Sequence, residues 1–575
     1  MEAKAPRKAM LLADLPIECW ERFLPADKAI MMNMTSKTVR DLMACGRPKV
    51  EIHLTLNARR ELAQDGDAKR MMMLQKLGAL AAKYHIVTLD LIHFGMTDHD
   101  FPQLAVALEK SVGLKCLELA VNDIGLGIRT LPYIGGLTSL TTLNLARCNN
   151  LIFWNMSLAL ILRSFPVLGV LSLEGNRMGL ITLDVETPPL CPALKFLCLR
   201  ENNLKFHSLL CVKEVLRQCP GLEHLDVSCN EFRAAEMDVL VGMFEHNPRL
   251  SYLNFDANDM KHDAMNVEQT LANALAPLEA LTEVNLTFNV LGGLRHLGPV
   301  FQKCKGLQYL NLGFTSIGPG GVQTLAGVLG HFEQLKALNL ASNGIGWRAT
   351  ETLAAALRGC RYLIGLNMSN NSIGVRGAVA LAEVLGNCPL KFLYLSCCEI
   401  GARGCEALGG VAFEQLDDLD LADNDIQARG VRVIARAVGK WPALKSLSLA
   451  GNYLGISGMR AVAGVLEDCQ GLTYLNIARN NVHDDGVQRL TQGLRSCPTL
   501  KELSLANNHV TDDGASGLAE VLPQCTALTK LCLSHNEKIG RAGERALASS
   551  VRFDLPLTIE LLQRSWMKPV GVVAS

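Results

Sequence analysis

The sequence predicts an α/β solenoid, a fold in which one short strand and one helix alternate many times along the chain. The pattern L-x-L-x-x-N recurs, with clean copies such as LSLEGN (171–176), LDLADN (419–424) and LSLANN (503–508). Consecutive copies are mostly 26 or 28 residues apart, with one interval of 31 residues over 258–289. Between copies, apolar residues follow helical spacing, as in GAVALAEVLGNC (377–388).

The first half of each unit is predicted to be a strand. Its alternating leucines point into the core and the residue between them points outward, because side chains alternate across a strand. The Asn that follows is expected to cap a turn by bonding backbone groups. Weaker copies, ending at Phe94, Cys148, Asn258, Asn289, Thr315 and Cys398, bring the total to seventeen units.

The second half of each unit is predicted to be a helix. A glycine six residues after the Asn position marks its expected start: Gly321, Gly377, Gly404, Gly430, Gly458, Gly486 and Gly514. Several cysteines share one register, eleven residues before the Asn position, which indicates buried packing sites and free thiols in a reducing compartment: Cys360, Cys469, Cys497 and Cys525. The adjacent Cys397 and Cys398 stand where a unit has x-Asn, which favours an irregular repeat over a redox or metal site.

The unit length and the phrase N-x-I-G-x-x-G-x-x-x-L-A-x-x-L-x-x-C-P-x-L resemble the ribonuclease-inhibitor class of leucine-rich repeat proteins over residues 87–562. The resemblance implies a horseshoe with a parallel sheet on the concave face and helices on the convex face. Seventeen strands at about 4.8 Å each would give an arc of roughly 80 Å, long enough to hold a protein domain.

The ends of the chain depart from the repeat. A strand is expected within 48–57 and a covering helix within 58–85, which together form a cap over 48–86. A last strand is expected within 555–563, followed by a tail over 563–575. A small helical segment is expected over 13–45, after a flexible start over 1–12.

Composition excludes several classes of function. Lys and Arg number 56, as do Asp and Glu, so no basic excess points to nucleic acid or an anionic membrane. Without a secretory signal or a membrane-length apolar run, the chain is expected to be soluble and cytoplasmic, with the nucleus as an alternative. It is expected to be monomeric apart from its complexes.

No catalytic constellation is visible. The motifs GxxxxGK[ST], HExxH and GxSxG are absent from the sequence. His483, Asp484 and Asp485 follow the pattern of the repeat, and Asp484 stands at an expected helix N-cap. Outward positions carry five consecutive asparagines, whose neutral amides cannot act as acid or base and can simply bond along the sheet: Asn254, Asn285, Asn311, Asn339 and Asn367. We therefore expect a protein without enzymatic activity, cofactor or metal.

Candidate partner-binding residues fall in two groups. One is aromatic, at outward or turn positions, and is typical of anchors for a protein partner: Tyr252, Phe288, Tyr309, Phe314, Phe392 and Tyr394. The other is the acidic run DDLDLADND (417–425), where Asp418 and Asp420 should face the concave side and Asp423 its rim. The run indicates a basic patch on the partner, with a solvated surface as the alternative. Two segments that interrupt the regular repeat, the long 258–289 interval and the helix-poor stretch 182–192, lie near these candidate residues.

The opening segment has a different pattern. Leu15-Pro16-x-Glu18 begins a predicted helix on which Trp20, Phe23 and Leu24 share one face. Two further short apolar helices follow within 25–43. Three such helices cannot form a sufficient core alone, so they need the first repeats or another protein as a partner.

This segment resembles an F-box, on the matches Leu15, Pro16, Glu18, Phe23, Leu24, Asp27, Ser36, Lys37, Arg40 and Leu42. It departs from that family at Val39, where a Trp is usual, and in a short first inter-helix stretch. The resemblance implies a substrate receptor of an SCF ubiquitin ligase, joined to a cullin complex through an Skp-type adaptor. The adaptor would contact Leu15, Pro16, Trp20, Phe23 and Leu24.

Two alternatives remain open at this point. The protein could be a scaffold or inhibitor in which the opening helices only cap the repeats. It could also be similar to the Ran GTPase-activating protein, which shares the repeat type but has an acidic tail where this chain ends in WMKPVGVVAS.

Overall fold

The structure is a computed structural model that describes residues 49–53, 66–81, 85–109, 113–124, 131–148, 158–176, 191–232, 234–258, 260, 267–550 and 557–561. The chain divides into two compact units, Met1–Leu286 (unit 1) and Thr287–Ser575 (unit 2). Their boundary falls inside the one 31-residue interval, 258–289. The F-box-like segment 13–45 and the stretch 182–190 lie outside the described residues.

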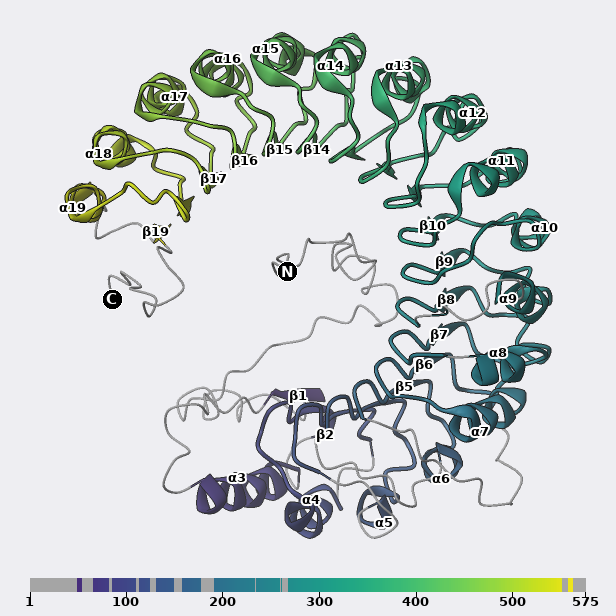
Figure 1. The fold of residues 1–575 in the computed structure, drawn as a ribbon. Helices are drawn as coiled ribbons and strands as arrows, with labels where there is room; N and C mark the ends of the chain where they lie inside the picture. The colour runs from purple at the N-terminus through teal and green to yellow at the C-terminus, as the bar shows by residue number, and fades with distance from the viewer. Residues whose placement is uncertain are drawn as a thin grey trace. The chain divides into compact units, whose positions relative to one another are not determined.

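Unit 1 contains one parallel sheet whose strands follow chain order (Figure 1). Its strands are β1 (Lys49–His53), β2 (His85–Asp90), β3 (Cys116–Glu118), β4 (Thr142–Asn144), β5 (Val170–Ser172), β6 (Phe196–Cys198), β7 (His224–Asp226), β8 (Tyr252–Asn254) and β9 (Glu283–Asn285). Its helices are α3 (Gly66–Ala81), the 3-10 turn η4 (Asp98–Asp100), α4 (Phe101–Leu108), α5 (Leu131–Ile134), α6 (Leu158–Ser164), α7 (Phe206–Arg217), α8 (Ala234–Leu240) and α9 (Val267–Leu275).

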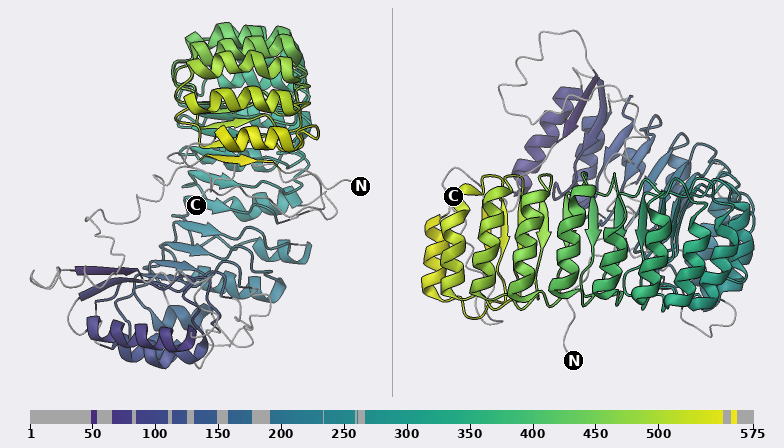
Figure 2. Two further views of the ribbon diagram at one scale, coloured as in Figure 1. Left: turned by 90° about the vertical axis from the view of Figure 1, so that its left-hand side faces the viewer. Right: turned by 90° about the horizontal axis from the view of Figure 1, so that it is seen from above.

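Unit 2 repeats the same arrangement more regularly, and its helices run side by side in a row (Figure 2). Its strands are β10 (Tyr309–Asn311), β11 (Ala337–Asn339), β12 (Gly365–Asn367), β13 (Phe392–Tyr394), β14 (Asp418–Asp420), β15 (Ser446–Ser448), β16 (Tyr474–Asn476), β17 (Glu502–Ser504), β18 (Lys530–Cys532) and β19 (Thr558–Glu560). Its helices are α10 (Leu297–Lys303), α11 (Gly318–Leu329), α12 (Trp347–Leu357), α13 (Gly374–Leu385), α14 (Gly401–Gly409), α15 (Gln427–Ala437), η5 (Val438–Lys440), α16 (Gly455–Asp468), α17 (Asp484–Ser496), α18 (Asp512–Val521), η6 (Leu522–Gln524) and α19 (Arg541–Ser550).

The predicted α/β solenoid is confirmed. In each unit the strands line the inner, concave side and the helices the outer, convex side (Figure 1). The middle residue of each inner strand is a buried leucine or valine that lies in register with its neighbours, as in Leu338, Leu366 and Leu393. Burial of each such side chain contributes about 1.5–3 kcal/mol, which makes this apolar column the continuous core of each unit.

The Asn of the repeat does more than cap its own turn. Asn452 is fully buried, and its Nδ2 donates to the carbonyl oxygens of Leu449 (3.0 Å) in its own unit and Leu421 (2.8 Å) in the preceding unit. Its Oδ1 accepts from the backbone amide of Asn424 at 2.9 Å. The same bonds recur at Asn230, Asn343 and Asn508, so one buried amide per repeat joins consecutive turns in these repeats.

The irregular copies keep this connection in part. Thr315 donates its hydroxyl to the Leu312 carbonyl, as an Asn would. Cys398 is buried at the Asn position and its amide donates to Asn424 Oδ1 at 3.0 Å. Cys397 takes the left-handed backbone conformation (φ 54°) found just before the Asn in other units. These observations support an irregular repeat at the cysteine pair. The cysteines of the shared register, such as Cys360 and Cys469, are buried as predicted.

The predicted helix starts are wrong by two or three residues. Helix α13 begins at Gly374, which has a φ of +59°, and not at Gly377. Gly377 lies in the first helical turn, where a Cβ would approach Ile373 to 2.9 Å and Thr350 to 3.2 Å. The second glycine of I-G-x-x-G is therefore required by close packing of the helix start, and the first by backbone conformation.

The expected N-cap role of Asp484 is also wrong. Helix α17 begins at Asp484 itself, after His483. The Asp484 carboxylate accepts hydrogen bonds from the Thr511 amide (2.8 Å) and the Gly514 amide (3.1 Å) at the start of the next helix, α18. Asp512 repeats this one unit later with the amides of Gly540 and Gly543. The acidic residue caps the helix of the following unit.

The two kinds of asparagine make different predictions for stability. Asn452→Ala leaves several buried backbone groups without partners, each worth about 1–3 kcal/mol, so we expect a loss of about 3 kcal/mol or more. Asn476→Ala, on the half-buried third position of β16, loses one bond to the Ala478 amide and should lose less than about 1 kcal/mol. Chemical denaturation followed by circular dichroism measures both. Equal shifts of the midpoint would contradict the role given to the buried amide.

Candidate protein-binding surfaces

Each short strand presents its first and third side chains outward, on either side of the buried middle residue. Because the strands are parallel and in register, these side chains line up from unit to unit. Asp418, Ser446 and Tyr474 are partners in one such row, and Asp420, Ser448 and Asn476 in another. The rows form the concave surface of each unit.

The five predicted outward asparagines are structural. Asn254, Asn285, Asn311 and Asn367 are buried at their outward-facing strand positions. The Oδ1 atoms of Asn311, Asn339 and Asn367 accept from the amide two residues further along their own strand, at 3.0–3.2 Å. Bonding along the sheet is seen between Asn254 Nδ2 and Asp226 Oδ2 at 3.1 Å.

The acidic run of unit 2 forms a defined surface, which we call the acidic surface: Tyr394, Asp418, Asp420, Asp423 and Tyr474. The Tyr394 hydroxyl donates to Asp418 Oδ2 at 2.8 Å, and Asp420 Oδ1 accepts from the Ala422 amide at 3.0 Å. Asp423, just beyond the strand, pairs with Arg479 at 2.8 Å. The positions of Asp418 and Asp420 on the concave side and of Asp423 at its edge agree with the sequence pattern.

Two of these carboxylates are compensated by hydrogen bonds alone, Asp418 through Ser446 and Tyr394 and Asp420 through Ser448 and the Ala422 amide. Asp418 and Asp420 are half-buried, and no Lys or Arg of the described residues lies within ion-pair distance of either. Burial raises the pKa of Asp418 and the pKa of Asp420, and it also raises the pKa of the Tyr394 hydroxyl. Loss of hydration disfavours the charged carboxylate, so an added cation would be favourable here.

A hollow of about 340 Å³ lies at the rim of the acidic surface. Its lining includes the acidic residues Glu399, Asp423 and Asp425, together with Tyr453 and Gly451. Tyr453 is 64% exposed. Gly451 has a φ of +65°, and a Cβ there would collide with Asp423, so this position needs glycine. The hollow combines negative charge with an exposed aromatic ring.

The predicted aromatic residues occupy several places. Phe288 and Phe314 stack at 4.3 Å between ring centroids, and Phe288 is 41% exposed. Tyr309 and Phe392 are first residues of β10 and β13, with the small side chains of Ala337 and Gly365 at the same position between them. Tyr252 belongs to unit 1, where it stacks on His224. Between the two aromatic residues this row therefore holds an alanine and a glycine, and Gly365 is buried.

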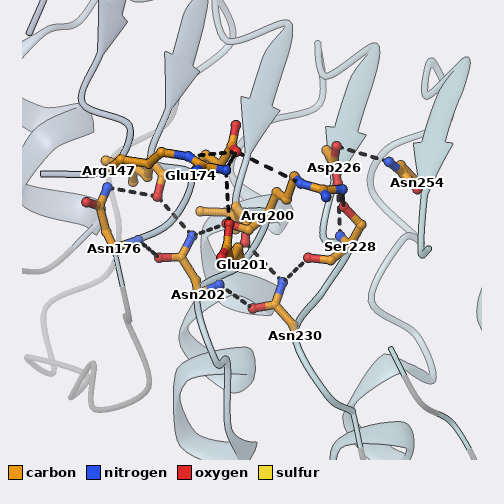
Figure 3. A network of polar contacts seen from close by, with 12 residues as sticks. Arg147, Glu174, Asn176, Arg200, Glu201, Asn202, Asp226, Ser228, Asn230 and Asn254 are labelled. Atoms are coloured by element: carbon orange, nitrogen blue, oxygen red, sulfur yellow. Dashed lines mark hydrogen bonds and ion pairs between the residues drawn. The ribbon is translucent and has the colours of Figure 1, made fainter. Parts of the chain in front are cut away.

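A second polar surface lies on unit 1 and was missed from the sequence. We call it the unit 1 network: Arg147, Glu174, Arg200, Glu201, Asp226, Ser228 and Asn254 (Figure 3). Arg147 pairs with Glu174 at 2.9 Å and with Glu201 at 3.2 Å. Arg200 lies 3.9 Å from Glu174 and donates to Ser228 Oγ at 3.0 Å.

The network continues to Asp226, which accepts from the Ser228 amide (2.9 Å), the Ser228 hydroxyl (2.6 Å) and Asn254. Beside it, His224 is stacked between Phe196 at 4.1 Å and Tyr252 at 3.7 Å. Burial lowers the pKa of His224 to about 3, so its imidazole is neutral at physiological pH. These three rings are the first residues of β6, β7 and β8.

Asp256 completes this surface. It is 3% exposed, and its Oδ1 has no hydrogen-bond partner within the described part of the chain. Burial raises the pKa of Asp256 to about 6, opposed by Arg200 and reinforced by Asp226. Asp256, Phe196 and His224 do not stand between the two leucines of a repeat, so the outward position of the pattern does not identify them. Their 28-residue spacing was the available signal.

Cys198 does not have the properties of a nucleophile. It is the strand partner of Asp226, and burial raises the pKa of the Cys198 thiol to about 12. A reactive cysteine needs a lowered pKa and an imidazolium or base partner. The residues that the structure describes also contain no group of three metal-binding side chains, and none of their helices is long and apolar enough to cross a membrane.

Comparison with known proteins agrees with the fold. A family model described as Leucine Rich repeat matches residues 303–326, 359–382, 386–409, 416–435, 468–490 and 496–519. These six segments, all of them in unit 2, match leucine-rich repeats. Proteins of this class generally bind other proteins through extended concave surfaces.

Two solved structures illustrate what the chain is similar to. One is an internalin from Listeria monocytogenes str. 4b F2365, at 18% identity over 72% of this chain and 95% of that chain, with a TM-score of 0.41. The other is a TLR13–ssRNA13 complex, at 16% identity over 80% of this chain and 67% of that chain, with a TM-score of 0.45. No curated protein sequence matches the chain.

Proposed function

We propose that the chain is a non-enzymatic protein-binding protein and that the acidic surface of unit 2 holds a basic segment of its partner. The observation that carries the proposal is the pair Asp418 and Asp420, half-buried carboxylates without a basic counter-ion in the described residues. Carboxylates in this state gain from a cation supplied by a partner, because the desolvation is already present before binding.

The neighbouring side chains suit the same partner. Tyr394 is held in place by its bond to Asp418, and Phe392 lies on the same strand, next to Gly365 of β12. Rigid aromatic side chains at the centre of a surface are the residues that contribute most to protein binding. The rim hollow, with Glu399, Asp423, Asp425 and Tyr453, would accept a Lys or Arg side chain, whose cation is attracted both by carboxylates and by an aromatic face.

Within this class, we further propose a substrate receptor of an SCF ubiquitin ligase. The support is the F-box resemblance of residues 15–42, and its contact residues Leu15, Pro16, Trp20, Phe23 and Leu24 lie outside the described part of the chain. In this form the acidic surface would hold the substrate. A scaffold or inhibitor uses the same surface without the adaptor, and a Ran-type GTPase-activating protein would use it to hold the GTPase.

The acidic surface can be tested with a labelled peptide of alternating Arg and Ser. Asp418→Asn with Asp420→Asn should weaken binding by at least about tenfold in fluorescence anisotropy, since close charge pairs across interfaces couple by about 1.5 kcal/mol or more. Wild-type affinity should also fall as the pH is lowered through the raised pKa values of these carboxyls, because protonation removes their charge.

The control for this experiment removes two negative charges from exposed helix positions of unit 2, Glu383→Gln in α13 and Glu520→Gln in α18. It should change the affinity less than about twofold, because screened surface charges contribute little. A similar loss in both double variants would mean that only net charge is sensed. No loss in the aspartate variant would rule out the acidic surface.

The adaptor proposal has its own test. Full-length chain should capture a purified Skp-type adaptor, and the triple variant Leu15→Ala, Pro16→Ala and Phe23→Ala should not. The melting temperature of the variant should equal that of the wild type, because these residues would contact the adaptor and not the repeats. If the wild type captures no adaptor, or if the variant melts earlier, the opening segment serves the repeats and the scaffold alternative holds.

A further inference from the structure

The unit 1 surface carries a second site that differs from the acidic surface in geometry. Three side-chain rows cross strands β6, β7 and β8 and the turns that follow them: Phe196, His224 and Tyr252; Cys198, Asp226 and Asn254; and Arg200, Ser228 and Asp256. The rows place an aromatic stack beside a hydrogen-bonded polar network.

The charges of this site do not balance. Arg147 and Arg200 face four carboxylates, those of Glu174, Glu201, Asp226 and Asp256. Arg147 pairs with Glu174 and Glu201. Arg200 is then the one arginine of the cluster that interacts with Asp226 and Asp256, and Arg200 also interacts with Glu174. On this side of the cluster one guanidinium therefore serves both Asp226 and Asp256, which leaves it one positive charge short.

Asp256 is the group that points to a ligand. Its carboxyl is almost fully buried, yet Oδ1 has no donor within the described residues. A buried polar oxygen without a partner is unfavourable and rare in folded proteins. Asp226, one strand away, already accepts three hydrogen bonds, so its own position is held firmly.

We propose that this face of unit 1 binds an arginine side chain of a protein partner, with Asp256 and Asp226 as acceptors for its guanidinium group. Asp226 and Asp256 come from neighbouring strands and differ by two positions in register, so they are diagonal neighbours about 7–8 Å apart. The forked donors of one guanidinium can reach two carboxylates across such a span, whereas a lysine ammonium offers a single point of charge. The inference extends the proposed protein-binding function to unit 1 and does not require the acidic surface.

The neighbouring side chains can accommodate the ligand. The apolar stem of an arginine would pack along the edges of the His224 and Tyr252 rings. His224 does not repel the incoming cation, because burial keeps its imidazole neutral. Arg200 has a second carboxylate within reach, Glu174 at 3.9 Å, toward which it can move as the ligand takes its place.

The experiment uses the full chain carrying Asp418→Asn and Asp420→Asn, which removes these two charges from the acidic surface. The probe is a labelled peptide of alternating Gly and Arg, compared with peptides that carry Lys or uncharged citrulline in place of Arg. We expect the Arg peptide to bind, the Lys peptide to bind at least about threefold more weakly, and the citrulline peptide to show no binding. Adding Asp256→Asn should weaken Arg-peptide binding at least about fivefold.

Two controls keep the result interpretable. Asp238→Asn removes one exposed negative charge from helix α8 of the same unit and should leave the affinity within about twofold. The denaturation midpoint of Asp256→Asn at pH 7.5 should be no lower than that of its parent, since the substitution removes a desolvated charge. Should it be lower, Asp226→Asn replaces it as the test variant.

The outcomes separate this inference from the proposed function. It is overturned if Asp256→Asn leaves Arg-peptide binding unchanged, if Asp238→Asn weakens binding equally, or if the Arg and Lys peptides bind alike. The proposed function of the acidic surface fails separately, when the Asp418 and Asp420 substitutions do not weaken binding of the Arg-Ser peptide. If the substitutions weaken peptide binding at one surface and not at the other, the surface at which binding weakens is the one that binds the peptide.

Discussion

In most repeats one buried asparagine joins the turns of this solenoid, and the other features depend on it. Its amide bonds the backbone of its own turn and of the preceding one, as Asn452 does with Leu449, Leu421 and Asn424. The bonds hold consecutive strands in register and keep the residue before the Asn in the left-handed conformation. Because register is fixed in this way, side chains at equal positions become rows, and a row on short rigid strands is a binding surface.

Two such surfaces carry carboxylates that the protein itself leaves partly unsatisfied. In unit 2, Asp418 and Asp420 are half-buried without a basic partner among the described residues, and in unit 1 Asp256 is buried with an unpaired oxygen. Desolvated charges of this kind lower the stability of the free protein. Local violations of good packing are expected where a surface is kept for a ligand. Both surfaces therefore favour positively charged partners, although the whole chain is electrically neutral.

The sequence predicts the strand and helix alternation because leucine spacing and the Asn position are local requirements of every unit. The prediction fails where a side chain interacts mainly with the neighbouring repeat. Asp484 caps the helix of the following unit, and Gly377 is required by packing against Thr350 of the preceding helix. His224 and Asp256 were missed for a related reason. Their surroundings come from β6 and β8 or from side chains of adjacent units, and no single unit contains the signal.

The proposal that partners bind the strand side of the repeats can be measured directly by site-specific photo-crosslinking in the full chain. A benzoylphenylalanine at Phe392, the first residue of β13, would report on the concave face of unit 2. The same residue at Val379, exposed on helix α13, would report on the convex face. With a bound protein partner, we expect crosslinks from position 392 and few from position 379. Crosslinks from position 379 alone would place the partner on the helices and contradict the proposed binding surface.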